Sequence, residues 1–253
     1  VFNYFNDINS IRDNSQVNLD YTNPISEKTK LELGLEYRGD NTDNINLTDQ
    51  EIYEFQTDVN GNFVFDPQGN PIITGTNPIG SSDFDFQRNI YSGYVNYGSN
   101  FKKFTMQLGA RFEIFQIDGI FNRYTDITKT VLAATETVDQ DLFNIYPSAF
   151  FTYSPSEKNQ WQVSYSRRID RPGIQQVNPI REWSTPLIVS VGNPDLVPQF
   201  TNSFELNYTR KIKGGNLTFG TFYRNITDVI SRITNPDPAN PEVGQILSFT
   251  NFD

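Results

Sequence analysis

Histidine and cysteine are both absent from the 253-residue sequence. Without histidine, the chain lacks the commonest general base and the commonest transition-metal ligand. Without cysteine, it has no disulfide framework, no thiol nucleophile and no thiolate metal site. The familiar hydrolase arrangements rely on a histidine base, so we predict that the protein is not an enzyme and has no resident cofactor.

Long apolar runs and an excess of basic residues are also missing. No segment approaches the roughly 20 apolar residues of a membrane-spanning helix. The net charge of −10 argues against a nucleic-acid partner. The first residues, Val1–Asn9, have neither the basic start nor the apolar core of a signal peptide. We therefore expect the sequence to begin inside a longer polypeptide.

What the chain does contain is a long alternating segment, Phe104–Ile114. Its even-numbered residues are apolar, whereas the odd-numbered ones include Gln107, Arg111 and Glu113. A tilted strand of about 9–11 residues crosses a bilayer, and its side chains point alternately to two faces. The segment therefore predicts a strand with one face in lipid and the other toward a wet interior. A soluble sandwich also alternates, so this segment alone leaves both possibilities open.

The same alternation recurs along the whole chain. Its further apolar rows are Val17–Tyr21, Leu31–Tyr37, Tyr91–Tyr97, Ala149–Tyr153, Trp161–Tyr165, Phe204–Tyr208 and Leu217–Tyr223. Aromatic residues make up 14% of a chain that is only 36% hydrophobic. This composition is typical of a barrel with aromatic girdles and a polar lumen. No segment has the period of an amphipathic helix.

The connections between these rows alternate between short and long. The short ones lie at Asn23–Lys28, Tyr97–Phe101, Ser154–Asn159 and Lys211–Gly215, and the long ones at about residues 40–83, 117–140, 170–200 and 227–245. Outer-membrane barrels have short periplasmic turns and long extracellular loops. A soluble meander has no reason to lengthen every second connection. The rhythm therefore favours an all-β fold, a transmembrane antiparallel β-barrel.

The first long connection contains two glycine-centred segments, Asp58–Asn62 and Asp66–Pro71. Oxygen side chains alternate around glycine there, as in calcium-binding loops, but the bidentate glutamate of such loops is missing. The Asn-Gly and Gly-Asn turns of a loop hairpin account for the same residues. We favour the hairpin and keep calcium as the alternative.

Several motifs in the second half of the chain carry a family resemblance. They are Tyr146-Pro147-Ser148, Tyr165–Pro172, Asn178-Pro179, Gly192–Pro198, Phe204–Leu206 and Phe222–Arg224. With these motifs, the segment Tyr146–Ile230 resembles the C-terminal half of a TonB-dependent outer-membrane receptor barrel, within the branch related to SusC-like transporters. Leu19–Pro24 and Leu31–Gly34 resemble an earlier hairpin of the same family. One position departs from the family pattern, because Gln199 stands where a glutamate is usual.

The resemblance implies that residues 1–253 are part of one outer-membrane β-barrel domain. They would supply about nine strands of a plugged barrel of about 22 strands, with the plug domain and the signal peptide outside this chain. It further implies the outer membrane of a Gram-negative bacterium, contact with the lipid bilayer, and coupling to the inner-membrane TonB complex through the plug. A surface lipoprotein is a further expected partner.

Eleven motif residues are interpreted as structural: Arg168, Asp170, Arg171, Pro172, Asn178, Pro179, Gly192, Asn193, Pro194, Asp195 and Pro198. Proline fixes φ, and Asp195 can accept neighbouring backbone N–H groups in an Asx turn. We expect Arg168 and Asp170 to pair with lumenal groups or with the plug. Direct ligand contact is the alternative. By parity, the lumen-facing side chains include Gln107, Arg111, Glu113, Gln162, Glu205 and Arg224.

The leading functional hypothesis is TonB-dependent uptake of a nutrient, such as an oligosaccharide, a peptide or a metal chelate. The alternative is a non-transporting barrel that serves as a scaffold or assembly partner for surface lipoproteins or a larger outer-membrane complex. A soluble all-β binding module is the third hypothesis. Trp183 and Phe121 are candidates to stack on sugar rings or to anchor loops.

Overall fold

The computed structural model describes residues 5–185, 188–238 and 244–253, and these are almost entirely β-structure. The strands are β1 (Phe5–Ser26), β2 (Thr29–Phe55), β3 (Ile73–Ile79), β4 (Ser82–Phe101), β5 (Phe104–Tyr124), β6 (Leu132–Ser156), β7 (Asn159–Asp170), β8 (Glu182–Thr185), β9 (Ile188–Ser190), β10 (Gln199–Ile212), β11 (Gly215–Thr227), β12 (Val229–Pro236) and β13 (Gln245–Phe252). A single helical turn, α1, covers Ile174–Val177. Within the described ranges, no helix is long and apolar enough to cross a membrane.

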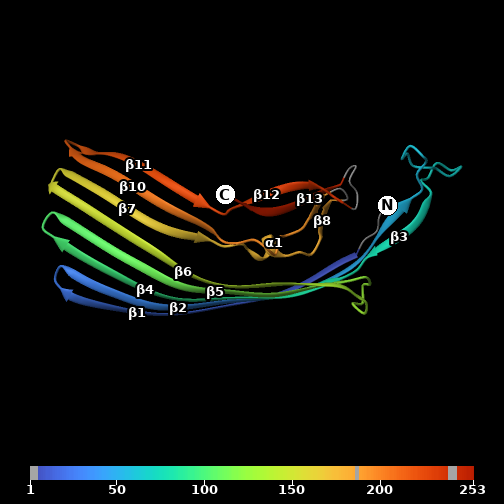
Figure 1. Cartoon of the computed structure of the whole chain (residues 1–253), viewed down its shortest axis with the longest axis horizontal. Helices are drawn as coiled ribbons and strands as arrows, with labels where there is room; N and C mark the ends of the chain where they lie inside the picture. The colour runs from blue at the N-terminus through green and yellow to red at the C-terminus, as the bar shows by residue number, and fades with distance from the viewer. Residues whose placement is uncertain (1–4, 186–187, 239–243) are drawn as a thin grey trace. The chain divides into compact units, whose positions relative to one another are not determined.

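The strands form two sheets (Figure 1). The larger sheet has nine strands in the order β1-β2-β4-β5-β6-β7-β10-β11, with β3 paired to β2, so β1 and β11 are its edges. The smaller sheet has the order β12-β13-β9-β8. All pairings with a recorded register are antiparallel except β13 with β9. The expectation of about nine antiparallel strands is therefore confirmed.

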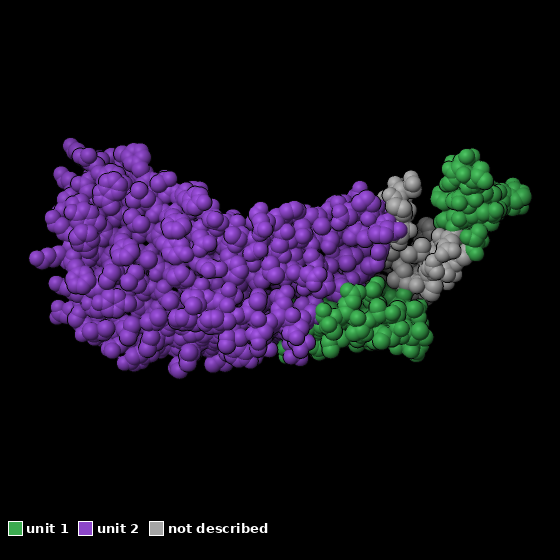
Figure 2. All heavy atoms as spheres, viewed as in Figure 1, with its two compact units in different colours: residues 1–12, 41–86, 119–137 green, residues 13–40, 87–118, 138–253 purple. Residues whose placement is uncertain are grey.

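The chain also divides into two compact units, coloured separately in Figure 2. Unit 1 comprises residues 1–12, 41–86 and 119–137. Unit 2 comprises residues 13–40, 87–118 and 138–253, and it contains all of β7, β10 and β11. The strands β1, β2, β4, β5 and β6 each pass from one unit into the other.

Four tight turns join consecutive strands of the large sheet. Each has two residues, at positions 27–28, 102–103, 157–158 and 213–214. Lys102 has φ 48° and Gly214 has φ 89°, the left-handed backbone that tight hairpin turns require. Three of the four predicted short connections contain these turns. The one predicted at Tyr97–Phe101 is wrong, because β4 continues to Phe101 and the turn follows it.

The long connections are present, but part of their length continues the neighbouring strands. β2 continues to Phe55 and β5 continues to Tyr124, while β6 already begins at Leu132. In the last connection, β12 pairs with β13 along its whole length. These extensions contain runs of polar residues, for example at 40–44. Such a run suits a strand outside lipid as well as it suits a loop, because strand pairing bonds the backbone groups whatever the side chains are.

The two faces of β5 exchange character at Ile114. Up to that residue one face is apolar and exposed, for example Leu108 and Phe112, while the other is polar. Beyond it, Gln116 and Asp118 continue the first face, whereas Phe115 and Ile117 on the second face are buried. A face that meets lipid and then water must change from apolar to polar, and the opposite face must change from wet to packed. The exchange marks the upper end of the predicted lipid-facing band.

These faces generate a testable difference between two neighbouring positions. We expect Leu108→Arg in the full-length protein to reduce folding into phospholipid vesicles, at a cost of about 2–4 kcal/mol for a charge at mid-bilayer. Gln107→Arg introduces the same side chain on the polar face and should cost far less. The folded fraction is measured by heat-modifiable migration on gels. Equal losses in both variants would contradict the assignment of faces.

Candidate functional site: a chain of ion pairs on the polar face

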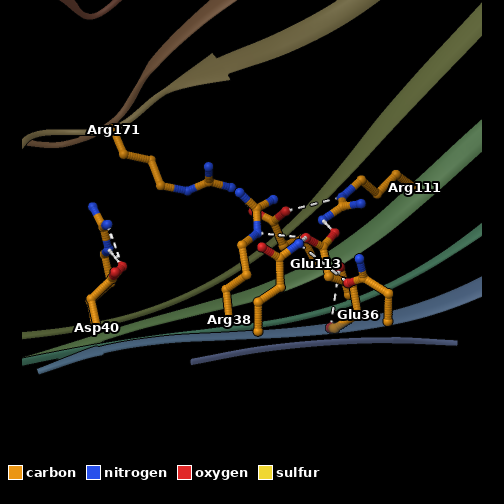
Figure 3. Close-up of polar contacts among 10 residues, drawn as sticks. Glu36, Arg38, Asp40, Arg111, Glu113 and Arg171 are labelled. Carbon is orange, nitrogen blue, oxygen red and sulfur yellow. Dashed lines mark hydrogen bonds and ion pairs between the residues drawn. The ribbon is translucent and has the colours of Figure 1, made fainter. Parts of the chain in front are cut away.

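A chain of alternating charges crosses the polar face of unit 2 (Figure 3). Glu36 of β2 lies 2.7 Å from Arg38 Nε and 2.6 Å from Arg111 Nη2. Arg111 Nε of β5 lies 3.2 Å from Glu113 Oε2, and Glu113 Oε1 in turn pairs with Arg171. The order is therefore Arg38, Glu36, Arg111, Glu113, Arg171. The chain begins and ends on arginine, so it carries one net positive charge.

A separate pair lies beside this chain. Arg88 of β4 donates from Nε to Asp40 Oδ2 over 2.9 Å and also pairs through Nη2. Both side chains are about 30% exposed, at 30% and 29%, whereas Glu113 is only 3% exposed. Burial at Glu113 makes it the member that most needs its partners, because a desolvated carboxylate without a counter-charge is costly.

Arg171 comes from a different part of the chain than its partners. It follows the end of β7, outside the membrane-spanning segment, and reaches over to β5, as Figure 3 shows. Its guanidinium carbon lies 5.1 Å from the ring centroid of Phe115, which is fully buried. Burial lowers the pKa of Arg171 to about 10, with a further contribution from the charges of Arg38, Arg88 and Arg111. The group remains protonated at neutral pH and so keeps its ion pair.

The segment that begins with Arg171 is folded tightly over residues 171–198. Pro172, Val177, Leu196 and Pro198 are fully buried. Gln140 on the polar face of β6 donates from Nε2 to the carbonyl of Leu196 over 2.8 Å. Together with the Arg171–Glu113 pair, this bond attaches the segment to the wall at two strands. We call residues 171–198 the anchored segment.

Gly192 is required where the anchored segment turns back on itself. Its N–H donates to the Asn178 carbonyl over 2.7 Å, and a Cβ at this position would lie 2.6 Å from the backbone nitrogen and oxygen of Asn178. The Asn193 N–H donates to the Gln176 carbonyl over 2.6 Å. Any larger residue at 192 would separate these two backbones. The glycine and the two motif asparagines therefore hold the segment closed.

Side chains of the motif also bind β12 and β13. Asn193 Nδ2 donates to the Phe249 carbonyl over 3.1 Å, and Asn251 exchanges hydrogen bonds with the backbone of Val197. Gln199 accepts the Ile230 N–H at 3.1 Å. This last bond gives the family-atypical glutamine a role that needs an acceptor oxygen but no charge.

The predicted Asx turn exists but is built differently. Asn193 Oδ1 accepts the N–H of Asp195 over 3.0 Å, so Asn193 and not Asp195 supplies the side chain. Arg168 and Asp170 form no ion pair within the described residues, so their pairing with other lumenal groups or with the plug stays a prediction. The register pairs them with Thr201 and Gln199, and the neighbouring Arg171 binds Glu113. Arg168 and Asp170 lie in β7, on the row that strand alternation predicts for them. Arg171 follows the end of β7, where alternation no longer fixes the direction of a side chain.

The six side chains predicted to face the lumen lie on one face of the sheet. Arg111 and Glu113 are in the chain of ion pairs. A Cβ at Gly109, on the same row as Gln107, would lie 2.6 Å from Ser148 Oγ. Ser148 pairs with Ser166, Ser166 with Ser203 and Ser203 with Arg224, and this face also carries Gln162 and Glu205. That the face lines a barrel lumen that carries a solute remains a prediction.

Sequence reasoning missed Glu36, Arg38, Asp40 and Arg88 as members of the site. The signal was present, because Glu36 and Arg38 continue the polar row of their strand. What the sequence lacks is the alignment between β2, β4 and β5, which decides which charges meet. Of the two aromatic candidates, Phe121 is 1% exposed and packs on Phe84, so it cannot stack on a sugar. The Trp183 side chain lies outside the described residues.

The two glycine-centred segments of the first long connection are hairpins. Asp58 Oδ1 accepts the N–H groups of Asn60 and Asn62, and Asp66 Oδ1 accepts those of Gln68 and Asn70. The bond from the Asn62 N–H is the main cause that lowers the pKa of Asp58. Among the described residues, no group of three or more acidic side chains could hold a metal ion. The bridges Thr57–Phe63 and Phe65–Pro71 close these turns, so the hairpin interpretation is confirmed. Calcium binding stays the untested alternative.

Comparison with known proteins now identifies the family. The model of the outer membrane protein beta-barrel family matches residues 2–253. The chain belongs to this family. The predicted barrel fold and outer-membrane location in a Gram-negative bacterium are thereby confirmed. A search of curated proteins returns no match.

Solved structures of outer-membrane receptors share the fold. The hemophore receptor HasR of Serratia marcescens, solved with its hemophore HasA and heme, has 13% identity and a TM-score of 0.55, with 98% of this chain and 44% of that chain covered. The ferric-catecholate import receptor Fiu of Escherichia coli K12 has 14% identity and a TM-score of 0.51, with 98% and 34% covered. The siderophore receptor PirA of Pseudomonas aeruginosa has 12% identity and a TM-score of 0.40, with 96% and 51% covered. The chain thus spans between a third and about half of the length of these receptors. The finer likeness to SusC-related barrels remains a prediction.

The chain of ion pairs can be tested at its most buried member. Glu113→Gln keeps the shape of the side chain but leaves Arg171 without a counter-charge. We expect it to lower the free energy of unfolding of the full-length protein by about 3 kcal/mol, the lower end for a broken buried pair, because Arg111 keeps Glu36. Urea titration of the protein in vesicles measures the change.

Glu136→Gln is the matched control for this variant. It breaks the Arg123–Glu136 pair, whose side chains are 40% and 38% exposed. Exposed pairs contribute about 0–1 kcal/mol, so the control should be nearly neutral. Similar losses in the two variants would show that Glu113 has no special dependence on burial.

Proposed function

We propose that the chain is the barrel portion of a receptor that takes up a nutrient across the outer membrane. The observation that carries the proposal is the fold, which matches HasR and Fiu over 98% of this chain. Both of those proteins are receptors by name, for a hemophore and for ferric catecholates. At 13% and 14% identity the likeness supports the type of barrel and leaves the cargo open. An oligosaccharide, a peptide and a metal chelate are all candidates.

Uptake through such a barrel needs energy, and we assign it to an inner-membrane TonB complex that acts on a plug domain. The polar face offers a surface suited to a plug or a solute. Its chain of ion pairs ends on Arg38 and Arg171, and the Nε atom of Arg171 is buried without a hydrogen-bond acceptor in the described part of the chain. An acidic group from the plug or the cargo would supply the missing acceptor and neutralise the net positive charge.

We further propose that the protein has no catalytic activity of its own. Its sequence has no histidine or cysteine to act as base or nucleophile. The carboxylates Glu36 and Glu113 are each bound to two arginines. Two guanidinium groups occupy each carboxylate, so neither is free to exchange a proton with a substrate.

A scaffold for a surface lipoprotein is the second candidate, and one observation favours it. The hairpins of residues 56–72 expose Val59, Phe63 and Phe65 at 101%, 55% and 55%, in a stretch from 39 to 87 that contains no lysine or arginine. Exposed apolar side chains among acidic ones suit a protein partner better than a small solute.

Gene deletion followed by uptake assays separates the two candidates. Cells that lack the full-length protein should fail to accumulate one member of a labelled panel of ferric siderophores, heme, oligosaccharides and peptides. Uptake should return with the wild-type gene, and should be lost again when the TonB complex is inactivated. Normal uptake of the whole panel, together with loss of a lipoprotein from the cell surface, would favour the scaffold and contradict transport.

A further inference from the structure

The lysines of this chain gather at one end of the strands. Seven of the eight lie in or within two residues of the four tight turns: Lys28, Lys30, Lys102, Lys103, Lys158, Lys211 and Lys213. We define the turn rim as residues 27–32, 101–104, 156–159 and 210–214. It contains eight basic and three acidic side chains, a net charge of +5. Because the whole chain carries −10, the remaining residues carry −15.

The positive charge of the turn rim is not neutralised within the rim. Lys30 pairs with Glu32 at 2.6 Å, and this is the one ion pair that involves a rim residue in the described ranges. The lysines at the turns are all exposed. A net charge that the protein leaves open in this way attracts a partner of the opposite sign.

A row of aromatic side chains runs beside the turn rim on the apolar face. Phe104 stacks on Tyr153 with ring centroids 4.5 Å apart, and Trp161 packs on Tyr208 at 4.4 Å. The register connects Tyr153 to Trp161 and Tyr208 to Phe219, so the row is continuous from β5 to β11. Tyrosine and tryptophan at such positions lie at the headgroup level of a membrane. The rim lysines are therefore next to the headgroups of the periplasmic leaflet.

We propose that the turn rim binds the headgroups of anionic phospholipids in the periplasmic leaflet. Lysine suits this place because its aliphatic stem lies along apolar surface while its ammonium group reaches the headgroups. Basic side chains near an anionic surface each contribute favourably, and the contribution falls with salt. The ligand class is a lipid with a phosphate diester and a net negative charge, such as phosphatidylglycerol.

An acidic periplasmic protein would also match the charge, but the distribution favours lipid. All four turns contribute basic residues, and the aromatic row follows the same path along the sheet. A partner protein would need a patch on one or two hairpins. A charge repeated at every hairpin follows the plane of the membrane.

Trp161 provides a natural reporter for the test, because it lies three residues after Lys158 and is 43% exposed. In the full-length protein, Trp183 and any tryptophan outside this chain are replaced by phenylalanine, so that Trp161 is the sole tryptophan. This protein is reconstituted in vesicles that contain brominated phosphatidylglycerol or brominated phosphatidylcholine. Bromine quenches tryptophan fluorescence at short range. We expect about threefold stronger relative binding of phosphatidylglycerol at low salt, falling toward equality near 1 M salt.

Three variants decide whether the rim lysines cause this preference. The triple variant Lys102→Gln, Lys103→Gln, Lys158→Gln should lose it, and the same three positions changed to arginine should retain it. Arg12→Gln, Arg123→Gln, Lys129→Gln removes the same charge outside the rim and should leave the preference unchanged. Heat-modifiable migration confirms that each variant is folded.

Two results would overturn the proposal. Equal quenching by both lipids in the wild type would mean that the rim does not select anionic headgroups. A preference that survives in the lysine-to-glutamine variant would place its origin elsewhere on the barrel. Neither result bears on uptake, so the proposed function is tested independently.

Discussion

The need to pair every backbone N–H and C=O inside lipid is the constraint on which this structure depends. An open strand edge within the hydrocarbon is too costly, so a membrane wall of strands must be a continuous hydrogen-bonded ladder. Here β1, β2, β4, β5, β6, β7, β10 and β11 form such a ladder, and the register of β7, β10 and β11 has no break. Once the ladder exists, the strand backbone fixes the face of each side chain, and successive side chains alternate between the two faces. The chemistry of each face then follows from what lies beside it.

On the polar face, this arrangement places charged side chains where they have little contact with water. Charges that point away from lipid are still partly desolvated, as Glu113 at 3% exposure shows, so each needs a partner. The same strand supplies Arg111, two residues before Glu113, but the second counter-charge comes from Arg171, beyond the end of β7. The same ion pair thus satisfies a buried carboxylate and fixes the start of the anchored segment. The Arg171–Glu113 ion pair therefore both pairs a buried carboxylate of the wall and holds the anchored segment in place.

The sequence alone predicts the strands of the wall, but it does not predict the ion pairs or the contacts of the anchored segment that covers them. Period-two alternation in Phe104–Ile114 identifies the strand and its faces because one face must be apolar over the bilayer. Above Ile114 the faces exchange, so the hydrophobic pattern continues on Phe115 and Ile117 with opposite parity. A pattern search that assumes one apolar face therefore ends the strand too early and assigns the extension to a loop. The ion pair of Glu36 with Arg111 depends on register across β2, β4 and β5, which no local pattern contains. The glycine and asparagines of the Gly192 motif could be recognised as structural, yet their partners Asn178 and Phe249 are distant in sequence.

The chain separates its two kinds of basic residue by physical need. The ion-pair chain uses only arginine, because a planar guanidinium with several donors contacts two carboxylates at once, as Arg111 does with Glu36 and Glu113. Arg171 also remains charged when buried, since a pKa of about 10 is still well above neutrality. An ammonium group in the same position would lose both the second contact and the stacking on Phe115. Lysine is placed instead at the turns, where a flexible stem and a strongly hydrated point charge suit the boundary between lipid and water. The distribution of arginine and lysine thus follows the same division between polar interior and membrane surface that the backbone ladder imposes.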